Sequence, residues 1–177
     1  RDFLQNSLKE LKTTNADWVG GPITNIATGI IGNAIAIAQQ SKFGVGGVAF
    51  RENIRIGKYV DTLAFGTYKR NVFKKIGGYD IELLRNQDDE FNFRMLQKDL
   101  KIWLHPSIKS YYYPKSAIHR LFKQYFQYGF FKIRVFQKRS SAASFRHIIP
   151  LIFIINLFYG IYSYLVTDFN IPILVLS

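Results

Sequence analysis

The sequence of 177 residues contains no cysteine, so it can form neither disulfide bonds nor thiolate metal sites. Acidic residues are also scarce, with 12 Asp and Glu against 24 Lys and Arg, which gives a formal net charge of +12. Apolar side chains are plentiful: the hydrophobic fraction is 48% and the aromatic fraction 16%, which excludes a disordered chain. The length allows one domain with a hydrophobic core, or a small domain with an appendage.

The shortage of acids is concentrated in one half of the sequence. Residues 1–99 carry 14 Lys and Arg against 11 Asp and Glu, whereas residues 100–167 carry ten Lys and Arg and no acid. This basic half predicts an anionic partner, either lipid headgroups or nucleic-acid phosphates. The chain starts at Arg1, shows no signal peptide and stops in an apolar run, so we expect it to be a piece of a longer protein.

Apolar spacing predicts a succession of short helices and strands up to residue 116. Glycines and Pro22 end the first strand, and Gly77-Gly78 caps a short helix. The glycines of residues 43–47 suit either a loop that approaches a ligand closely or a flexible surface loop. Helices are expected over 3–12, 29–40 (closely packed, from its small residues), 69–76 and 87–98, and strands over 17–20, 59–68, 101–105 and 110–114.

Three consecutive acids, Asp88-Asp89-Glu90, stand out in this basic chain. Adjacent carboxylates repel one another, so such a cluster is typical of a site that binds a cation or takes a proton. The alternative is a solvated first helical turn, where acids interact favourably with the helix dipole. His105 and His119 stand alone without metal-ligand spacing, and we expect them to be structural.

Aromatic and basic residues interleave over residues 117–139, and residues 148–167 carry no charge. The first pattern predicts either a helix that lies in the membrane interface or a segment that binds single-stranded nucleic acid. Twenty uncharged residues predict a transmembrane helix, with a buried core helix as the alternative. Membrane contact accounts for both patterns, so we expect no nucleic-acid partner, and the basic flank predicts that residues 1–147 face the cytoplasm.

The order of several motifs resembles the C-terminal half of a family 2 glycosyltransferase of the bacterial exopolysaccharide type, similar to succinoglycan-assembly enzymes. No one motif is decisive, but their order and spacing together are fairly specific. The stretches that carry the resemblance are Ala16-Asp17-Trp18-Val19-Gly20-Gly21-Pro22, Phe43-Gly44-Val45-Gly46-Gly47, Phe73-Lys74-Lys75-Ile76-Gly77-Gly78-Tyr79-Asp80, Asn86-Gln87-Asp88-Asp89-Glu90-Phe91-Asn92-Phe93-Arg94 and Gln124-Tyr125-Phe126-Gln127-Tyr128-Gly129.

The resemblance covers roughly residues 1–147 and implies an α/β fold of the GT-A type, which binds nucleotide-diphospho-sugars. Three regions follow from it. Residues 1–116 would be the acceptor side of the catalytic domain, and residues 117–147 an amphipathic interfacial region. Residues 148–177 would be a membrane-embedded segment with a transmembrane helix.

The resemblance also implies an inverting transfer of a sugar, of the hexosyltransferase type, in which a carboxylate deprotonates the acceptor hydroxyl. Aligning the family's acidic pattern places Asp88 at the base position and Gln87 where the family has Glu. Asp89 could share the role. We expect the charges of Asp89 and Glu90 to raise the pKa of Asp88, and Arg85 or Arg94 to lower it.

Acceptor-binding residues are implied at two places. Gly77 and Gly78 would shape the acceptor loop. Gln124, Gln127 and Tyr128 lie where processive relatives carry Gln-x-x-Arg-Trp, but Gln127 and Tyr128 replace the Arg and Trp. The replacement favours single-sugar transfer over processive synthesis. Lys115 could approach a phosphate.

The family binds a divalent cation, Mg or Mn, through an Asp-x-Asp motif, and this sequence contains no such motif. We expect that motif upstream of Arg1 in the full-length protein, no metal ligands in this chain, and no activity of the fragment alone. The expected partners are a nucleotide-sugar donor, a lipid-linked or polysaccharide acceptor and anionic lipid, at the inner face of the cytoplasmic membrane. A non-catalytic basic membrane-binding module is the alternative function.

Overall fold

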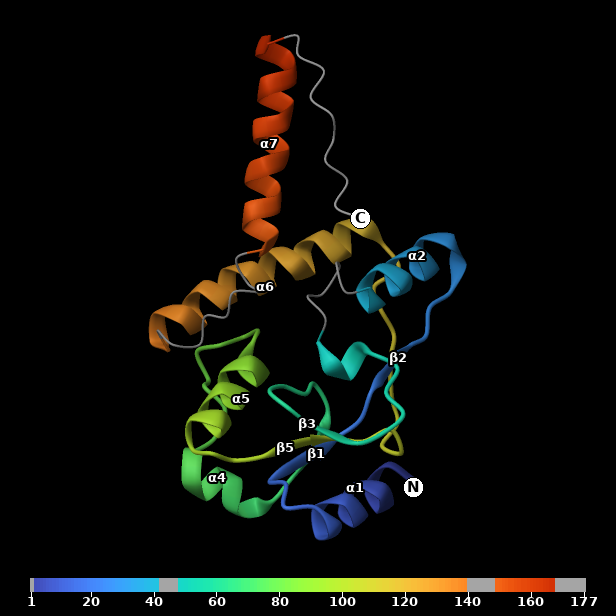
Figure 1. Cartoon of the computed structure of the whole chain (residues 1–177), viewed down its shortest axis with the longest axis vertical. Coiled ribbons are helices and arrows are strands. Elements are labelled where there is room, and N and C mark those ends of the chain that lie inside the picture. The colour runs from blue at the N-terminus through green and yellow to red at the C-terminus, as the bar shows by residue number, and fades with distance from the viewer. Residues whose placement is uncertain (1, 42–47, 140–148, 168–177) are drawn as a thin grey trace. The chain divides into compact units, whose positions relative to one another are not determined.

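A computed structural model of the chain describes residues 2–41, 48–139 and 149–167 (Figure 1). Its contacts divide the chain into two compact units, residues 1–142 and 143–177. The first unit mixes helices with two small sheets, which confirms the predicted α/β class. The prediction for the glycine-rich residues 43–47 lies outside the described residues.

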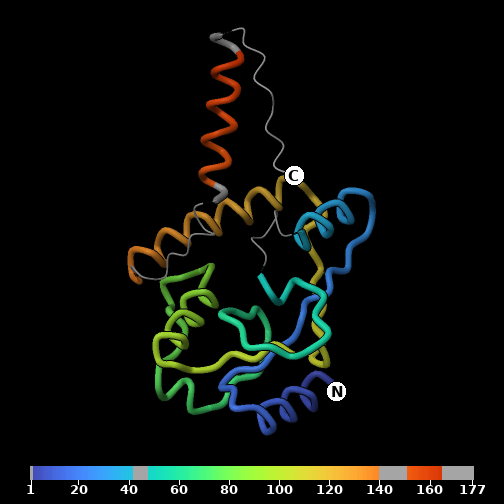
Figure 2. The backbone as a smooth tube through the Cα atoms, in the orientation of Figure 1, coloured from blue at the N-terminus to red at the C-terminus, as the bar shows by residue number. Residues whose placement is uncertain are grey.

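A four-stranded sheet with strand order β3-β5-β1-β4 forms the centre of the first unit. In Figure 2 blue, green and yellow-green segments of the backbone run side by side in this region. β1 (Trp18–Gly20) runs parallel to β5 (Ile102–Leu104) and antiparallel to β4 (Gly66–Tyr68). β3 (Lys58–Val60) pairs antiparallel with β5 at one edge. Two of these strands replace the single strand predicted over residues 59–68, because residues 61–65 turn the chain between the two edges of the sheet.

A second sheet has two strands, and each of them follows a strand of the first sheet along the chain. β2 (Ile23–Asn25) follows β1 and pairs in parallel with β6 (Ser110–Tyr112), which follows β5. The chain crosses between the sheets at glycines packed against backbone. A Cβ on Gly21 would lie 1.4 Å from the carbonyl oxygen of Ile108, so only glycine fits there.

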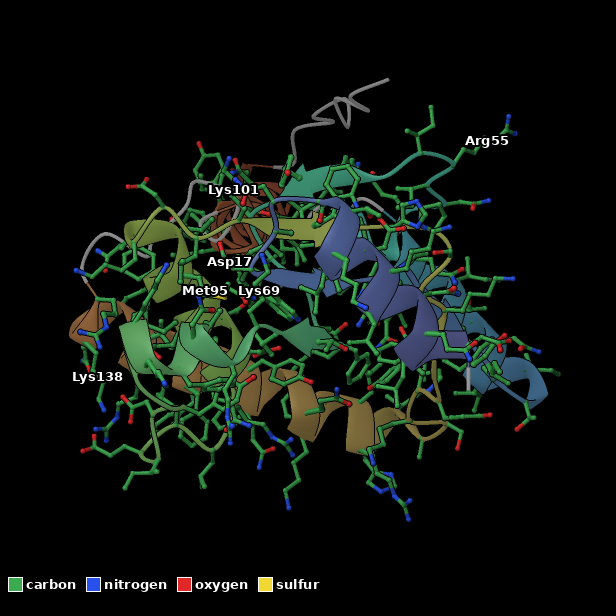
Figure 3. The ribbon with its side chains drawn as sticks, turned by 90° about the horizontal axis from the view of Figure 1, so that it is seen from below. Asp17, Arg55, Lys69, Met95, Lys101 and Lys138 are labelled. Carbon is green, nitrogen blue, oxygen red and sulfur yellow. The ribbon has the colours of Figure 1, made fainter. Side chains whose placement is uncertain are left out.

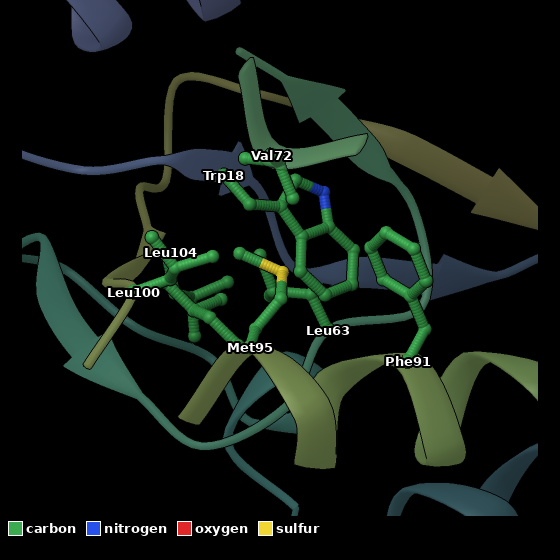
Figure 4. Close-up of a cluster of buried hydrophobic side chains, with 8 residues drawn as sticks. Trp18, Leu63, Val72, Phe91, Met95, Leu100 and Leu104 are labelled. Carbon is green, nitrogen blue, oxygen red and sulfur yellow. The ribbon is translucent and has the colours of Figure 1, made fainter. Parts of the chain in front are cut away.

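The core lies between the sheet and the acidic helix α5 (Gln87–Gln97), as Figure 4 shows. Phe91 and Met95 are fully buried on one face of α5, where their i,i+4 spacing places them. Tyr68 stacks on the Trp18 ring with 4.5 Å between centroids. The buried cluster consists of Trp18, Leu63, Val72, Phe91, Met95, Leu100, Ile102 and Leu104. This packing fixes the first turn of α5 relative to the sheet.

Polar contacts fix the edges of this core. The backbone amide of Lys101 donates to Asp17 Oδ2 at 3.0 Å, and the amide of Lys69 donates to the Asp17 carbonyl at 2.8 Å (Figure 3). The indole of Trp103 donates to Glu10 Oε2 at 3.0 Å, which holds the first helix, α1 (Asp2–Thr13), against β5. His105 bonds Ser107 at 2.7 Å, a structural arrangement as expected.

The remaining helices agree with the sequence in position. α4 (Arg70–Ile76) ends at Gly77, whose φ of 78° lies in the left-handed region, as predicted for a glycine cap. α2 (Gly29–Gln40) forms where predicted. The prediction that this helix is closely packed is wrong for one of its faces. Ile30 is 90% exposed and Ile37 69% exposed, while Ile35 and Ala36 on the opposite face are buried. A 3-10 turn, η1 (Ala49–Arg51), follows the undescribed residues.

Two long helices end the described chain, both where the sequence predicted them. α6 (Ile118–Lys138) belongs to the first unit, and α7 (Ile149–Thr167) to the second. Within α7, the side chain of Asn156 donates to the carbonyl oxygen of Ile152 at 2.8 Å. No helix in the described ranges is long and apolar enough to cross a membrane. The transmembrane helix predicted over residues 148–167 is therefore not supported.

Candidate active site at the start of the acidic helix

The three acids form the first turn of α5, as the sequence predicted. Asn86 precedes the helix in the left-handed conformation, with φ 59°. Asn is one of the few non-glycine residues that adopt this conformation readily. The turn lets residues 88–90 point in different directions, so each carboxylate has a different environment.

Asp88 is half-buried beside the aromatic side of the core. Its Oδ1 accepts the backbone N–H of Asp89 at 3.0 Å. Burial raises the pKa of Asp88, the charge of Asp89 raises it further, and backbone N–H groups and Lys132 lower it. The predicted effect of Asp89 is confirmed, but Glu90 is not among the groups that raise the pKa, and the cation that lowers it is Lys132 and not Arg85 or Arg94.

Two phenols share this environment. Asp88 interacts electrostatically with Tyr68 and with Tyr128, and burial is the largest cause that raises the pKa of each phenol. The Tyr68 hydroxyl lies 3.1 Å from that of Tyr79. Burial and the electrostatic influence of two protonated phenols make the carboxylate of Asp88 a candidate proton acceptor.

Asp89 is held by a cation from a distant part of the sequence. Lys132 Nζ donates to Asp89 Oδ2 at 2.7 Å. The side chain of Lys132 is only 19% exposed, and its ammonium also lies 5.6 Å from the centroid of the Phe136 ring. The two neighbouring acids thus differ: Asp89 is in a direct ion pair with α6, whereas Asp88 accepts backbone N–H groups.

Glu90 is fully buried between two arginines. Arg94 pairs with both of its oxygens, at 2.8 Å for Oε1, and Arg139 Nε donates to Oε1 at 3.0 Å. The i,i+4 spacing of Glu90 and Arg94 allows their pair, whereas the burial and the contact with Arg139 depend on the tertiary structure. These contacts give Glu90 a structural role, since its carboxylate is shared by two guanidinium groups.

Gly77 and Gly78, predicted to shape the acceptor loop, are tied to the acidic helix through the same arginine. Arg94 donates to the carbonyl oxygen of Gly78 at 2.8 Å and also to that of Ile76. Gly78 has open space around its Cα, with no atom within 4 Å of a built Cβ. The loop is therefore bonded to Arg94 in the last turn of α5, which in turn pairs with Glu90 of the first turn, and Gly78 has open space on one side.

The predicted residues of α6 also meet the acidic segment. Arg85 Nε donates to Gln127 Oε1 at 3.3 Å, and Asn86 Nδ2 donates to the carbonyl oxygen of Tyr128 at 2.7 Å. Together with Asp89–Lys132 and Glu90–Arg139, these contacts pair residues 85–90 with residues 127–139 in ascending order along both segments. The structure thus brings Asp88, Asp89, Gln127 and Tyr128 into one region.

Gln124 extends this region toward the second sheet. Its amide donates to the Tyr128 hydroxyl at 2.8 Å and to the Tyr112 hydroxyl at 3.2 Å. Its buried Oε1 has no hydrogen-bond partner among the residues that the structure describes. A buried amide oxygen of this kind is costly to leave unpaired, and a hydroxyl group could satisfy it.

Arg51 was not predicted from the sequence as a functional residue. Its guanidinium lies 5.7 Å from the centroid of the Tyr112 ring, and one buried terminal nitrogen has no hydrogen-bond partner within the described ranges. The signal that could have found it is its place just after the glycine-rich stretch. Lys115, suggested by the sequence as a phosphate contact, is exposed in the segment before α6. Among the described residues, no contact connects it with the region around Asp88.

No group of three or more His, Asp or Glu side chains gathers as metal ligands within the described part of the chain. The carboxylates of α5 do not form such a group, because Lys132 and two arginines occupy Asp89 and Glu90. These residues do not fit a divalent-cation site.

Comparisons with known proteins find two curated relatives. The chain is 29% identical over 150 residues to the succinoglycan biosynthesis protein ExoA of Rhizobium meliloti (strain 1021), covering 85% of this chain and 45% of the relative. It is 25% identical over 135 residues to the dolichyl N-acetyl-alpha-D-glucosaminyl phosphate 3-beta-D-2,3-diacetamido-2,3-dideoxy-beta-D-glucuronosyltransferase of Methanococcus voltae, covering 73% of this chain and 41% of that protein.

No family model and no solved structure matches the chain. The chain spans less than half the length of either curated relative. The two matches nevertheless confirm the resemblance inferred from the motifs: over most of its length, the chain is similar to family 2 glycosyltransferases.

Proposed function

We propose that this chain is the acceptor-side part of an inverting glycosyltransferase with a GT-A fold. The full-length protein would transfer a hexose from a nucleotide-diphosphate sugar to a lipid-linked or polysaccharide acceptor. The sequence relatives support a glycosyltransferase in general. Donor, acceptor, stereochemistry and location are parts of the proposal.

One observation carries the catalytic proposal: Asp88, half-buried and with a raised pKa, lies in the first turn of α5 between Asn86 and Asp89, which bond Tyr128 and Lys132 of α6. A general base must be ionised to accept a proton, and it works best when its pKa approaches the operating pH. Burial and the charge of Asp89 shift Asp88 in that direction. Asp89 could act only after losing its ion pair with Lys132.

In the proposed reaction the carboxylate of Asp88 takes the proton of the acceptor hydroxyl. The acceptor oxygen then forms a bond to the anomeric carbon of the donor sugar. The bond from that carbon to the phosphate oxygen breaks, and its electron pair leaves with the nucleoside diphosphate. A single displacement of this kind inverts the anomeric configuration.

Polar groups around Asp88 support an acceptor site there. The unpaired Oε1 of Gln124 could accept a hydrogen bond from a sugar hydroxyl, and the Tyr128 hydroxyl lies beside it. Gly78 leaves room for backbone approach. Tyr128 and Gln127 are bonded within the protein, which supports transfer of a single sugar.

Arg51 supports the placing of an anion near this site. Its buried nitrogen, unpaired within the described residues, adjoins Tyr112, which is bonded to Gln124. A guanidinium in such a position suits a phosphate oxygen. The divalent cation expected from the family stays a prediction, to be held by residues outside this chain.

We further propose that the protein works at the cytoplasmic face of the inner membrane. The outward face of α6 carries an outer stripe of exposed apolar side chains, flanked by the exposed cations Arg120 and Lys123. Its members are Ile118, Phe122, Phe126, Phe130 and Ile133. Aromatic rings beside cations suit an anionic lipid surface better than nucleic acid, because five apolar side chains along one face offer little for phosphate contact.

The product of the full-length protein tests the proposal. A panel of nucleoside-diphosphate hexoses would be incubated with the protein and with membranes from its own cells as the source of acceptor. We expect one donor to be consumed and the new linkage, read by NMR, to have the opposite anomeric configuration. Retention of configuration, or no transfer with any donor, would contradict the proposal.

The outer stripe also supports the second candidate, a non-catalytic membrane-binding module. That function needs the outer stripe and the flanking cations but not Asp88. Variants at Asp88 and on the outer stripe therefore separate the two functions.

A further inference from the structure

Two acids at the start of α5, Asp88 and Asp89, have the side-chain chemistry of a general base. The sequence cannot separate neighbours of identical chemistry. The structure separates them by what each touches: Asp89 Oδ2 lies 2.7 Å from the ammonium of Lys132, and Asp88 accepts the backbone N–H of Asp89 at 3.0 Å.

We infer that Lys132 is a positioning residue for the transfer reaction: by holding Asp89, it leaves Asp88 as the carboxylate that is free to meet the acceptor hydroxyl. The inference rests on the proposed function and adds to it a residue from α6. Lys132 acts through Asp89 and the helix turn, and it makes no contact with the reacting atoms itself.

The position of Lys132 is fixed by contacts on both sides of it along α6. Tyr128, one turn earlier, receives the hydrogen bond from Asn86 at 2.7 Å. Arg139, two turns later, pairs with the buried Glu90 at 3.0 Å. Because both neighbours are anchored to the same segment, the ammonium of Lys132 has little freedom to leave Asp89. The side chain of Lys132 is 19% exposed and that of Asp89 is 39% exposed, so the ion pair is only partly shielded from screening.

The pair also holds the geometry of the first turn. Asp88 and Asp89 are consecutive, so fixing the side chain of Asp89 on α6 fixes the orientation of the peptide that bonds Asp88 Oδ1. Reactions that depend on positioned groups lose rate steeply when those groups shift by about 1 Å. Lys132 therefore serves both to occupy Asp89 and to orient Asp88.

The charges around Asp88 predict how loss of Lys132 or of the Asp89 charge changes the pH dependence of the transfer rate. The groups that face Asp88 are Asp89 in its own helix, Lys132 and Tyr128 in α6, and Tyr68 in β4. Asp89 raises the pKa of Asp88, and Lys132 lowers it. Removing Lys132 must therefore move the acid limb of the rate profile to higher pH, and removing the charge of Asp89 must move it to lower pH.

The test measures sugar transfer against pH for the full-length protein and for Lys132→Met, Lys132→Arg and Asp89→Asn. We expect Lys132→Met to lower kcat about tenfold or more, as a displaced catalytic group does. Its acid limb should rise by about one pH unit, the effect of losing a nearby opposite charge. Lys132→Arg should stay close to the wild type, and the acid limb of Asp89→Asn should fall.

Lys138→Met is the matched control. Lys138 lies on the same helix and forms ion pairs of 2.7 Å with Asp80 and 2.6 Å with Glu82, and it is not among the groups that shift the pKa of Asp88. We expect it to leave kcat and the acid limb unchanged. An equal loss in Lys132→Met and Lys138→Met would show that α6 docking alone matters, and would overturn the inference.

The design separates this inference from the proposed function. A wild-type acid limb in Lys132→Met, together with an inactive Asp88→Asn, would overturn the role of Lys132 and leave the proposed base intact. Full activity of Asp88→Asn would overturn the proposed function itself. Should Lys132→Met fail to fold, Lys132→Gln removes the same positive charge and keeps a polar side chain, and an unmoved acid limb in that variant would also overturn the inference.

Discussion

Arg139, at the end of α6, lies 3.0 Å from Glu90, which is fully buried in the first turn of α5. The two residues are 49 positions apart in the sequence, and Arg94 completes the group from within α5 at 2.8 Å. The carboxylate is thus shared by two helices. This pair fixes the end of α6 on the acidic segment, while Asn86 and Asp89 fix its middle.

Glu90→Gln should destabilise the first unit strongly. The change leaves two guanidinium groups around a neutral side chain in a buried place, and breaking a buried ion pair this way costs about 3–5 kcal/mol. Thermal or urea unfolding measures the effect. Glu52→Gln is the control, since its pair with Lys58 at 3.2 Å is exposed and should contribute only about 0–1 kcal/mol. Similar effects of the two substitutions would contradict the structural role of Glu90.

Gly21→Ala should impair folding, because the new Cβ would lie 1.4 Å from the carbonyl oxygen of Ile108 and the backbone would have to move. Overpacking of this kind costs roughly 1–3 kcal/mol or more. Gly129→Ala is the contrast, since nothing lies within 4 Å of its Cβ and it sits inside α6. It should stabilise the protein by roughly 0.5–1 kcal/mol through helix propensity. Melting temperatures that move the same way would disprove the close approach at Gly21.

Phe122→Gln with Phe126→Gln should weaken binding to vesicles that contain anionic lipid. Both rings are exposed on the outer stripe, at 72% and 67%, and each contributes apolar area to the membrane interface. Co-sedimentation with phosphatidylglycerol vesicles measures the loss. Tyr113→Gln, an equally exposed ring before α6, is the control. Unchanged sedimentation of the double variant would remove α6 from membrane contact.

Short-range features of the fold followed from the sequence. The helices at residues 2–13, 29–40, 70–76, 87–97 and 118–138 lie close to their predicted positions because apolar spacing and glycine caps are local signals. The division of residues 58–68 into two strands was missed. The two strands lie at opposite edges of one sheet, and that arrangement depends on pairing with β1 and β5, which no local pattern shows.

The candidate site was predictable only in part. The acids were visible as a cluster, and Gln124, Gln127 and Tyr128 came from the family resemblance. Lys132 and Arg139 could not be selected from the ten cations of the basic half, since their partners lie about 43 and 49 residues away. The exposed face of α2 was also misjudged. Small residues allow close packing, but they do not show whether a neighbour is present.

The central claim is that Asp88 is the base, and sugar transfer by Asp88→Asn in the full-length protein tests it most directly. Asp99→Asn is the matched control: Asp99 follows α5 with φ 54°, a conformation that Asn also tolerates. We predict that Asp88→Asn lowers kcat by about 10²–10⁴-fold, the usual loss of a general base, while Asp99→Asn stays near the wild type. Transfer by Asp88→Asn at close to the wild-type rate would contradict the account.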